Sequence, residues 1–308
     1  MTWGVNSKAL STLSFGFTSV IDAVFRGADV ALVMNVANGF WVPILKLRRI
    51  PVAMNVDGIE WERAKWGRVA KAVFRAGARM SARFADVLIV DAKAIGDFWQ
   101  SRFERNSTFI PYGAVEGPPV EAPLDLQSGK YVLIVARFVP ENTVHEFFDA
   151  VERIAPDYPV VIVGSAGYGG ELDARAQDLD RRHRSVRWLG HVADDVLLHS
   201  LWQHSGAYFH GHSVGGTNPA LVQAMMLGAP TVARDTIYNR EVLGEDYPSF
   251  VDPDEESIER GLRALMEDEK LRGELTVRLK ERARRLYTWS AVASEYERTL
   301  RSLLPSDE

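Results

Sequence analysis

The sequence predicts an α/β fold made of two doubly wound domains, each with a parallel sheet, that face a cleft. Short apolar runs without strict alternation recur along the chain, and segments of helical periodicity separate them. The length of 308 residues suits about two domains. A proline-rich stretch with few apolar residues, 116–123, divides this pattern into halves and is typical of a linker.

In the first half, each predicted strand is short and apolar and lies between helical patterns. The strands are expected at 29–36, 50–56, 86–90 and 107–110, and the helices at about 8–26, 39–48, 63–84 and 91–104.

The second half repeats this alternation and then ends in helices. Strands are expected at 131–136, 160–164, 186–189, 207–210 and 231–233, with helices near 143–154, 170–183, 194–204 and 218–228 between and after them. Further helices are expected near 239–244, 255–268, 270–286 and 289–303. Ligands of such folds bind at the carboxyl ends of the strands, and the cleft between two such domains is the default site.

Composition excludes several classes of function. The net charge of −5 argues against general nucleic-acid binding. The chain has no cysteine, so it has no disulfide, no thiolate metal ligand and no cysteine nucleophile, and a cytosolic location is consistent with this. No run of 18 apolar residues predicts a membrane span.

The most informative motif is Gly211–Met225, GHSVGGTNPALVQAM. It follows an apolar strand, and Thr217 or Asn218 is expected to cap the helix that opens with Pro219. Backbone N–H groups at such a helix start attract phosphate, and adjacent glycines allow an anion to approach closely. The motif therefore predicts an anion site, although an ordinary strand-to-helix connection would have the same pattern.

The histidines suggest a metal site as an alternative. Five of the seven lie between His191 and His212, and imidazole is a good zinc ligand. No HExxH pattern supports this interpretation, so we expect no bound metal, and His212 is instead expected to donate a hydrogen bond to a diphosphate.

Several ordered motifs resemble retaining GT-B glycosyltransferases of family 4, in the rhamnosyltransferase-like bacterial branch. The matching pieces are VDGIEWERAKW (56–66), ADVLIVDA (85–92), IPYGA (110–114), ARFVPEN (136–142), Gly190-His191, the 211–225 motif, NREVLG (239–244) and the terminal helix 287–304. The resemblance implies an acceptor-side domain at 1–117, to which 287–308 returns, and a nucleotide-sugar donor domain at 124–286. It implies no cofactor and no metal.

The resemblance assigns the donor diphosphate to Arg137 and to the backbone of Gly215, Gly216 and Thr217. His212 and Asp57 join Arg137 as catalytic candidates. Gly190, His191, Asn218 and Gln223 complete the donor-binding set.

Two positions depart from this family's pattern. Many relatives have a lysine a few residues after the arginine, where this chain has Pro140-Glu141-Asn142-Thr143. Gln223 replaces a glutamate that binds the donor ribose, and a neutral amide accepts a hydrogen bond more weakly than a carboxylate. We therefore expect weaker donor binding, unless Gln223 is a helix residue without a ligand.

The acceptor-side candidates are Asp57, Glu60 and Arg63, which follow the predicted strand 50–56. The resemblance implies that they contact a glycan or lipid-linked glycan acceptor. Turn and helix-cap chemistry explains the same residues equally well.

The predicted helix 62–84 has a basic face that adjoins an apolar one. Arg68, Lys71, Arg75, Arg79 and Arg83 fall on one stripe. This stripe could meet anionic lipid at the inner face of a bacterial membrane, or it could be the solvated face of a core helix.

The resemblance implies that the first domain opens on an inner strand of this fold, so the first strand, glycine-rich loop and helix of relatives are expected to be missing from 1–117. The resemblance also implies the function: a glycosyltransferase that moves a sugar, rhamnose in this branch, from a nucleotide-diphosphate donor in surface polysaccharide synthesis. The alternatives are a catalytically impaired nucleotide-binding or partner subunit and a GT-B sugar-nucleotide epimerase.

Overall fold

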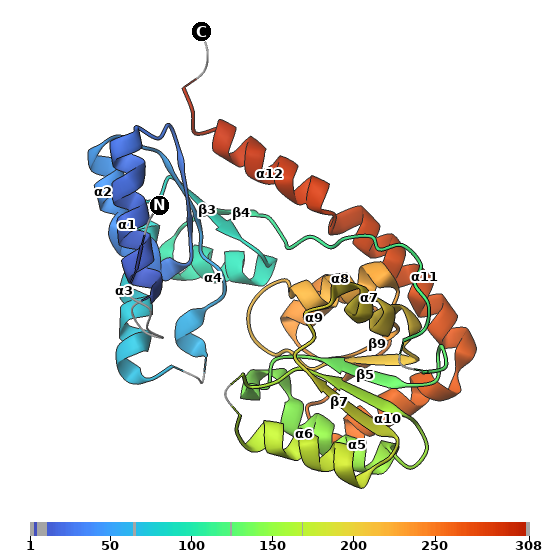
Figure 1. The fold of residues 1–308 in the computed structure, drawn as a ribbon. Helices are drawn as coiled ribbons and strands as arrows, with labels where there is room; N and C mark the ends of the chain where they lie inside the picture. The colour runs from blue at the N-terminus through green and yellow to red at the C-terminus, as the bar shows by residue number, and fades with distance from the viewer. Residues whose placement is uncertain (1–2, 5–10, 64–65, 124, 168, 306–308) are drawn as a thin grey trace. The chain divides into compact units, whose positions relative to one another are not determined.

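The computed structural model describes residues 3–4, 11–63, 66–123, 125–167 and 169–305, and each of its two units is built around a parallel sheet (Figure 1). The first unit comprises Met1–Pro111, Val214–Gly216 and Ser290–Glu308. The second comprises Tyr112–Ser213 and Thr217–Trp289. The α/β class with two parallel sheets is confirmed, and the segment after Pro111 belongs to the second unit.

The first unit has a four-stranded parallel sheet in the order β1-β2-β3-β4. In chain order its elements are α1 (Ser11–Arg26), β1 (Ala31–Met34), η1 (Val36–Trp41), α2 (Val42–Leu47), β2 (Val52–Asn55), η2 (Glu60–Glu62), α3 (Arg68–Phe84), β3 (Val87–Val90), α4 (Lys93–Phe103), β4 (Ser107–Phe109) and α12 (Trp289–Arg301). Among the described residues β1 is an edge strand, and two of its apolar side chains, Leu32 and Met34, are 40% and 47% exposed.

Two predicted helices of this unit begin differently from expectation. The helix expected at 39–48 is the 3₁₀ turn η1 followed by α2, because Asn35 adopts a left-handed φ of 68° and its side chain caps Ala37 N. The helix expected from 63 begins at Arg68, since Arg63 is extended and ends the turn η2. The expected start of the first helix at 8–10 lies outside the described residues.

Helix α3 packs closely against η1 through two glycines. A Cβ added to Gly77 would lie 2.3 Å from Val36 O, and one added to Gly39 would lie 2.3 Å from Gly77 O. Both positions therefore need glycine because the two backbones touch.

The terminal helix α12 belongs to the first unit from Ser290 onward. Its Val292 is buried in a cluster with Ala53, Ile89 and Ile110. Asn55 Nδ2 donates to the Tyr296 hydroxyl at 2.6 Å, which adds a polar contact beside this cluster.

The second unit has a six-stranded parallel sheet in the order β10-β9-β8-β5-β6-β7. Its elements are β5 (Val132–Val135), η3 (Pro140–Asn142), α5 (Val144–Ile154), β6 (Val160–Val163), α6 (Glu171–Arg182), β7 (Val186–Gly190), α7 (Asp195–His204), β8 (Ala207–His210), α8 (Pro219–Leu227), β9 (Thr231–Arg234), α9 (Ile237–Leu243), β10 (Phe250–Val251), α10 (Glu255–Glu267) and α11 (Glu269–Leu286).

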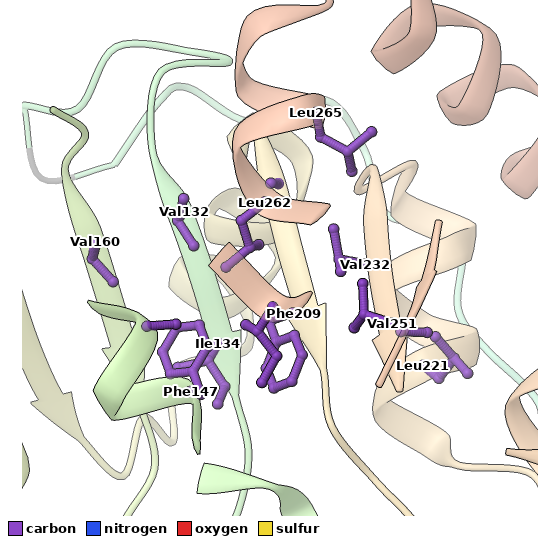
Figure 2. Close-up of a cluster of buried hydrophobic side chains, with 14 of the residues drawn as sticks. Val132, Ile134, Phe147, Val160, Phe209, Leu221, Val232, Val251, Leu262 and Leu265 are labelled. Carbon is purple, nitrogen blue, oxygen red and sulfur yellow. The ribbon is translucent and has the colours of Figure 1, made fainter. Parts of the chain in front are cut away.

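Alternate residues of the central strands enter two separate clusters of buried side chains, one on each face of the sheet. Val132 and Ile134 of β5 join the larger cluster with α5 and α10, whereas Leu133 joins the smaller one with α7 and α8. Figure 2 shows part of the larger cluster, in which the rings of Phe147 and Phe209 stack with centroids 5.1 Å apart. Burial on both faces explains why these strands read as continuous apolar runs.

Side chains of α7 and α8 hold the expected linker onto the second unit. Gln203 Nε2 donates to Pro118 O at 2.8 Å, and Ser200 Oγ donates to Glu121 O. Gln223 bonds to both backbone groups of Val115. The segment is therefore an ordered part of this unit.

Candidate functional site

A cavity of about 820 Å³ opens at the carboxyl ends of the central strands of the second unit. Its walls come from the loops after β5, β6, β7 and β8 and from the start of α8. The lining residues are Val135, Ala136, Arg137, Asn142, Val163, Gly164, Ser165, Ala166, Gly167, His191, Val192, Leu198, His210, Gly211, His212, Asn218, Pro219 and Ala220. This is the edge at which doubly wound sheets bind ligands.

The charge of the lining suits an anion. The lining includes one arginine, three histidines and no carboxylate. Arg137 follows β5 after one intervening residue, Ala136, so the strand places its backbone at the rim. Its guanidinium offers a fork of donors that matches phosphate oxygens.

The start of α8 is built as the sequence predicts. Asn218 is the N-cap, its side chain accepts from Ala220 N at 2.9 Å, and Pro219 occupies the first turn. Gly215 adopts a left-handed φ of 96° in the loop before it, and Gly216 and Thr217 follow. Asn218, Pro219 and Ala220 line the cavity, so the positive end of this nine-residue helix lies at its wall.

The loops after β5 and β8 interlock beneath the cavity. Asn142 Nδ2 donates to Arg137 O at 2.8 Å, and Asn142 Oδ1 lies 2.6 Å from His212 Nδ1. Ser213 N donates to Glu141 O at 2.9 Å. A Cβ added to Gly211 would lie 2.4 Å from Asn142 O, so the approach of the loops requires glycine there.

Thr143 closes this arrangement in a strained conformation. Its φ is 55°, which is costly for a β-branched residue, on the order of 1–3 kcal/mol. Its hydroxyl donates to Gly211 O at 2.6 Å and accepts from Arg234 Nη1 at 3.0 Å. Two well-made hydrogen bonds therefore hold the strained residue at the junction of the two loops.

His210 is the last residue of β8 and is 4% exposed. Burial, together with the charge of His212, holds the pKa of His210 well below its usual value of 6.5. The Tyr208 hydroxyl lies 3.1 Å from His210 Nδ1. His210 is therefore neutral at physiological pH, and its Nδ1 has a buried partner.

Comparisons with known proteins agree with this geometry. Residues 122–286 match the family of glycosyl transferases group 1. The chain belongs to this family. Residues 40–115 match a domain of unknown function, DUF1972. No curated protein matches the sequence closely enough to show a relationship.

Solved structures share the fold of this glycosyltransferase at low sequence identity. Sucrose-phosphate synthase from Thermosynechococcus elongatus is 17% identical with a TM-score of 0.79, over 95% of this chain and 78% of that one. Anabaena HepE in complex with UDP-glucose is 16% identical with a TM-score of 0.74, over 94% and 82%. TarM from S. aureus, in complex with Fondaparinux, alpha-GlcNAc-glycerol and UDP, is 13% identical with a TM-score of 0.72, and this chain spans 59% of its length. The GT-B fold of the glycosyltransferase is thereby established.

Four predicted donor-site residues line one cavity of the glycosyltransferase: Arg137, His191, His212 and Asn218. Gly190 ends β7 with a left-handed φ of 62° and turns the chain toward His191. Gly190 itself is not part of the lining.

Gln223 does not line the cavity. Its Oε1 accepts from Val115 N at 2.9 Å, and its Nε2 donates to Val115 O at 2.8 Å. Both polar atoms of the amide are therefore engaged by the backbone of the segment that enters the second unit.

The acceptor-side candidates of the first unit lie in the loop after β2. Asp57 has a left-handed φ of 57°, and its Oδ1 accepts from Gly58 N at 2.9 Å. Glu60 is buried, pairs with Arg63 Nε at 2.8 Å and accepts from Trp66 Nε1. None of the three caps α3, whose N-cap is Gly67.

Sequence reasoning missed three residues that build the site. Asn142 entered only as the place of an absent lysine, yet it joins the two loops. Arg234 and Asn239 were not singled out, although Asn239 Nδ2 donates to both His212 O and Arg234 O. Arg234 ends β9, so the strand-end rule that selected Arg137 also applies to it.

Among the residues that the structure describes, no group of three or more His, Asp or Glu side chains could hold a metal ion. No helix among these residues is long and apolar enough to cross a bilayer.

Proposed function

We propose that this glycosyltransferase moves a sugar from a nucleotide-diphosphate donor to a glycan or lipid-linked glycan, with retention of configuration, in bacterial surface polysaccharide synthesis. The observation that carries the proposal is the carboxylate-free cavity with Arg137 and the start of α8 at its wall. HepE and TarM, whose complexes contain UDP or UDP-glucose, share its fold. Rhamnose is the sugar that the sequence resemblance implies.

The chemistry required is stabilisation of a leaving group. When the glycosidic bond to the donor breaks, negative charge builds on the diphosphate. In this proposal the Arg137 guanidinium and the amides at Gly216 and Thr217 balance that charge, without a metal ion or cofactor. His191 and Asn218 complete the donor site, and Asp57, Glu60 and Arg63 act on the acceptor side.

Calorimetry with UDP tests the donor site. Arg137→Ala should weaken UDP binding by about 1.5–3 kcal/mol, the range for a hydrogen bond to a charged group. Arg285→Ala, an exposed arginine of α11, is the matched control and should bind as the wild type does. Equal affinities of the two variants would contradict the assignment of Arg137.

A transfer assay separates the two functional alternatives. UDP-glucose and dTDP-rhamnose are offered with lipid-linked acceptors, and release of the nucleotide is measured with and without acceptor. Acceptor-dependent release supports the transferase. Binding of UDP without release under any condition would instead favour the catalytically impaired subunit.

The proposal includes a peripheral position at the inner face of the membrane. On α3, Arg68, Arg75, Arg79 and Arg83 are exposed, and no ion pair engages them among the described residues. Val69 of the same helix is 80% exposed. Cosedimentation with phosphatidylglycerol vesicles should exceed that with phosphatidylcholine, and Arg75→Glu with Arg79→Glu should abolish the difference.

A further inference from the structure

The hydrogen bonds of Asn142 determine where the neutral ring of His212 carries its proton. The amide nitrogen of Asn142 donates to Arg137 O, which can only accept, so the amide cannot be reversed. The amide oxygen therefore faces His212 Nδ1 at 2.6 Å. Since this oxygen can only accept, Nδ1 must carry the hydrogen.

The neighbouring His210 has a different kind of partner. Its Nδ1 lies 3.1 Å from the Tyr208 hydroxyl, which can both donate and accept, and its buried Nε2 has no hydrogen-bond partner among the described residues. The two rings have centroids 6.1 Å apart, yet only His212 faces a partner that is restricted to accepting.

We propose that Asn142 is a positioning residue that holds neutral His212 with its proton on Nδ1, so that His212 binds a phosphate oxygen only after Nε2 takes up a proton. This inference rests on the proposed function, in which a diphosphate enters the cavity that His212 lines. Neutral Nε2 presents a lone pair, which repels an anionic oxygen, whereas the imidazolium donates to it. The proton comes from solvent, and no covalent bond changes.

The surroundings of His212 favour this proton uptake once an anion is bound. Among the described residues of the second unit, the charged and titratable groups on elements packed near His212 include His210 on β8, Arg137 after β5, Glu141 in η3, His191 after β7 and Arg234 at the end of β9. Helix α8 contributes no titratable group, and α9 reaches His212 through Asn239. A dianionic ligand offsets the positive charge of Arg137, so the imidazolium becomes cheaper to form.

Nitrogen NMR of the full chain with labelled histidine tests the tautomer without any ligand. The signals of His212 are assigned with His212→Gln. The wild type should show Nδ1–H for His212, and the signals of His210 serve as the internal reference. Asn142→Ala should move His212 toward the Nε2–H form that free imidazole prefers and leave His210 unchanged. Wild-type His212 in the Nε2–H form would overturn the proposal.

Calorimetry of UDP binding in buffers of different ionisation enthalpy tests the proton uptake. At pH 7.5 the wild type should take up a fraction of one proton more than His212→Gln does. Taking this difference cancels any protons that UDP itself gains or loses, because UDP is the same in both titrations. Asn142→Ala should match His212→Gln, because its neutral ring can donate directly. In Asn142→Asp the carboxylate stabilises the imidazolium before UDP arrives, so UDP should cause less uptake than in the wild type. Equal proton uptake in all four proteins would overturn the proposal. Absence of UDP binding would instead contradict the proposed function, and the NMR experiment would then decide the tautomer of His212 on its own.

Discussion

The side-chain amide of Gln223 in α8 forms a pair of hydrogen bonds with both backbone groups of Val115, 108 residues earlier in the chain. The amide has an acceptor oxygen and a donor nitrogen side by side, so it can pair with the N–H and the C=O of one residue at the same time. The expected contact of Gln223 with the donor ribose would therefore compete with the observed hydrogen bonds to Val115.

Gln223→Glu should loosen the segment at Val115 rather than tighten donor binding. The carboxylate can still accept from Val115 N, but it has no hydrogen for Val115 O and repels that oxygen. We expect a loss of about 1 kcal/mol of unfolding free energy and unchanged affinity for UDP. Thermal denaturation and calorimetry measure the two effects, with the exposed Gln177→Glu of α6 as the control. Tighter UDP binding by the Gln223→Glu variant at unchanged stability would restore the ribose contact.

Gly77→Ala should destabilise the protein. The added methyl group would lie 2.3 Å from Val36 O, so η1 and α3 must separate. Overpacking of this kind costs about 1–3 kcal/mol, which outweighs the better helix propensity of alanine. Gly273→Ala inside α11 meets no atom within 4 Å and is the control. Denaturant unfolding should show a lower midpoint for Gly77→Ala alone, and equal midpoints would mean that η1 accommodates the methyl group.

His210 should make the protein sensitive to mild acid. Burial holds its folded-state pKa well below 6.5, so the unfolded chain binds the proton first as the pH falls. Stability that is present above pH 6.5 is then lost progressively below it. His210→Gln removes this titration and should flatten the dependence of the unfolding midpoint on pH between 7 and 5. Parallel curves for the two proteins would show that His210 is charged, or compensated, in the folded state.

The edge strand β1 should promote self-association. Edge strands present unpaired backbone groups, and here Leu32 and Met34 add exposed apolar surface. Met34→Lys places a charge on this edge and should lower the association measured by light scattering at high protein concentration. Val277→Lys, which changes an exposed apolar residue of α11, should have no such effect. An identical reduction in both variants would indicate a general effect of charge.

Much of the fold could be predicted because its signals are local. Runs such as Val132–Val135 and Val160–Val163 are buried on both faces, and the Asn218-Pro219 pair marks the start of α8. The two-residue strand β10 was missed because Phe250–Val251 is too short to show a period. At the site, the family resemblance pointed to Arg137 and His212, and both line the cavity.

The contacts that sequence reasoning could not reach are between distant segments. Asn142 meets His212 across 70 residues, and Gln223 meets Val115 across 108. A single Asn or Gln side chain leaves no periodic pattern in the sequence, so neither pair could be predicted from it. Only the order of the strands in the sheet brings these pairs together.

Apart from His210, every polar side chain that lines the cavity comes from a loop, from the turn η3 or from the N-cap of α8, whereas the two buried clusters lie mainly on strands and helices. Substitutions in these connecting segments can therefore alter recognition while the packing that folds the unit is inherited intact. Segments 137–143 and 210–213 are expected to diverge together, since hydrogen bonds from Thr143 to Gly211, between His212 and Asn142, and from Ser213 to Glu141 join them. A graft meant to transfer donor preference between relatives must carry both segments together.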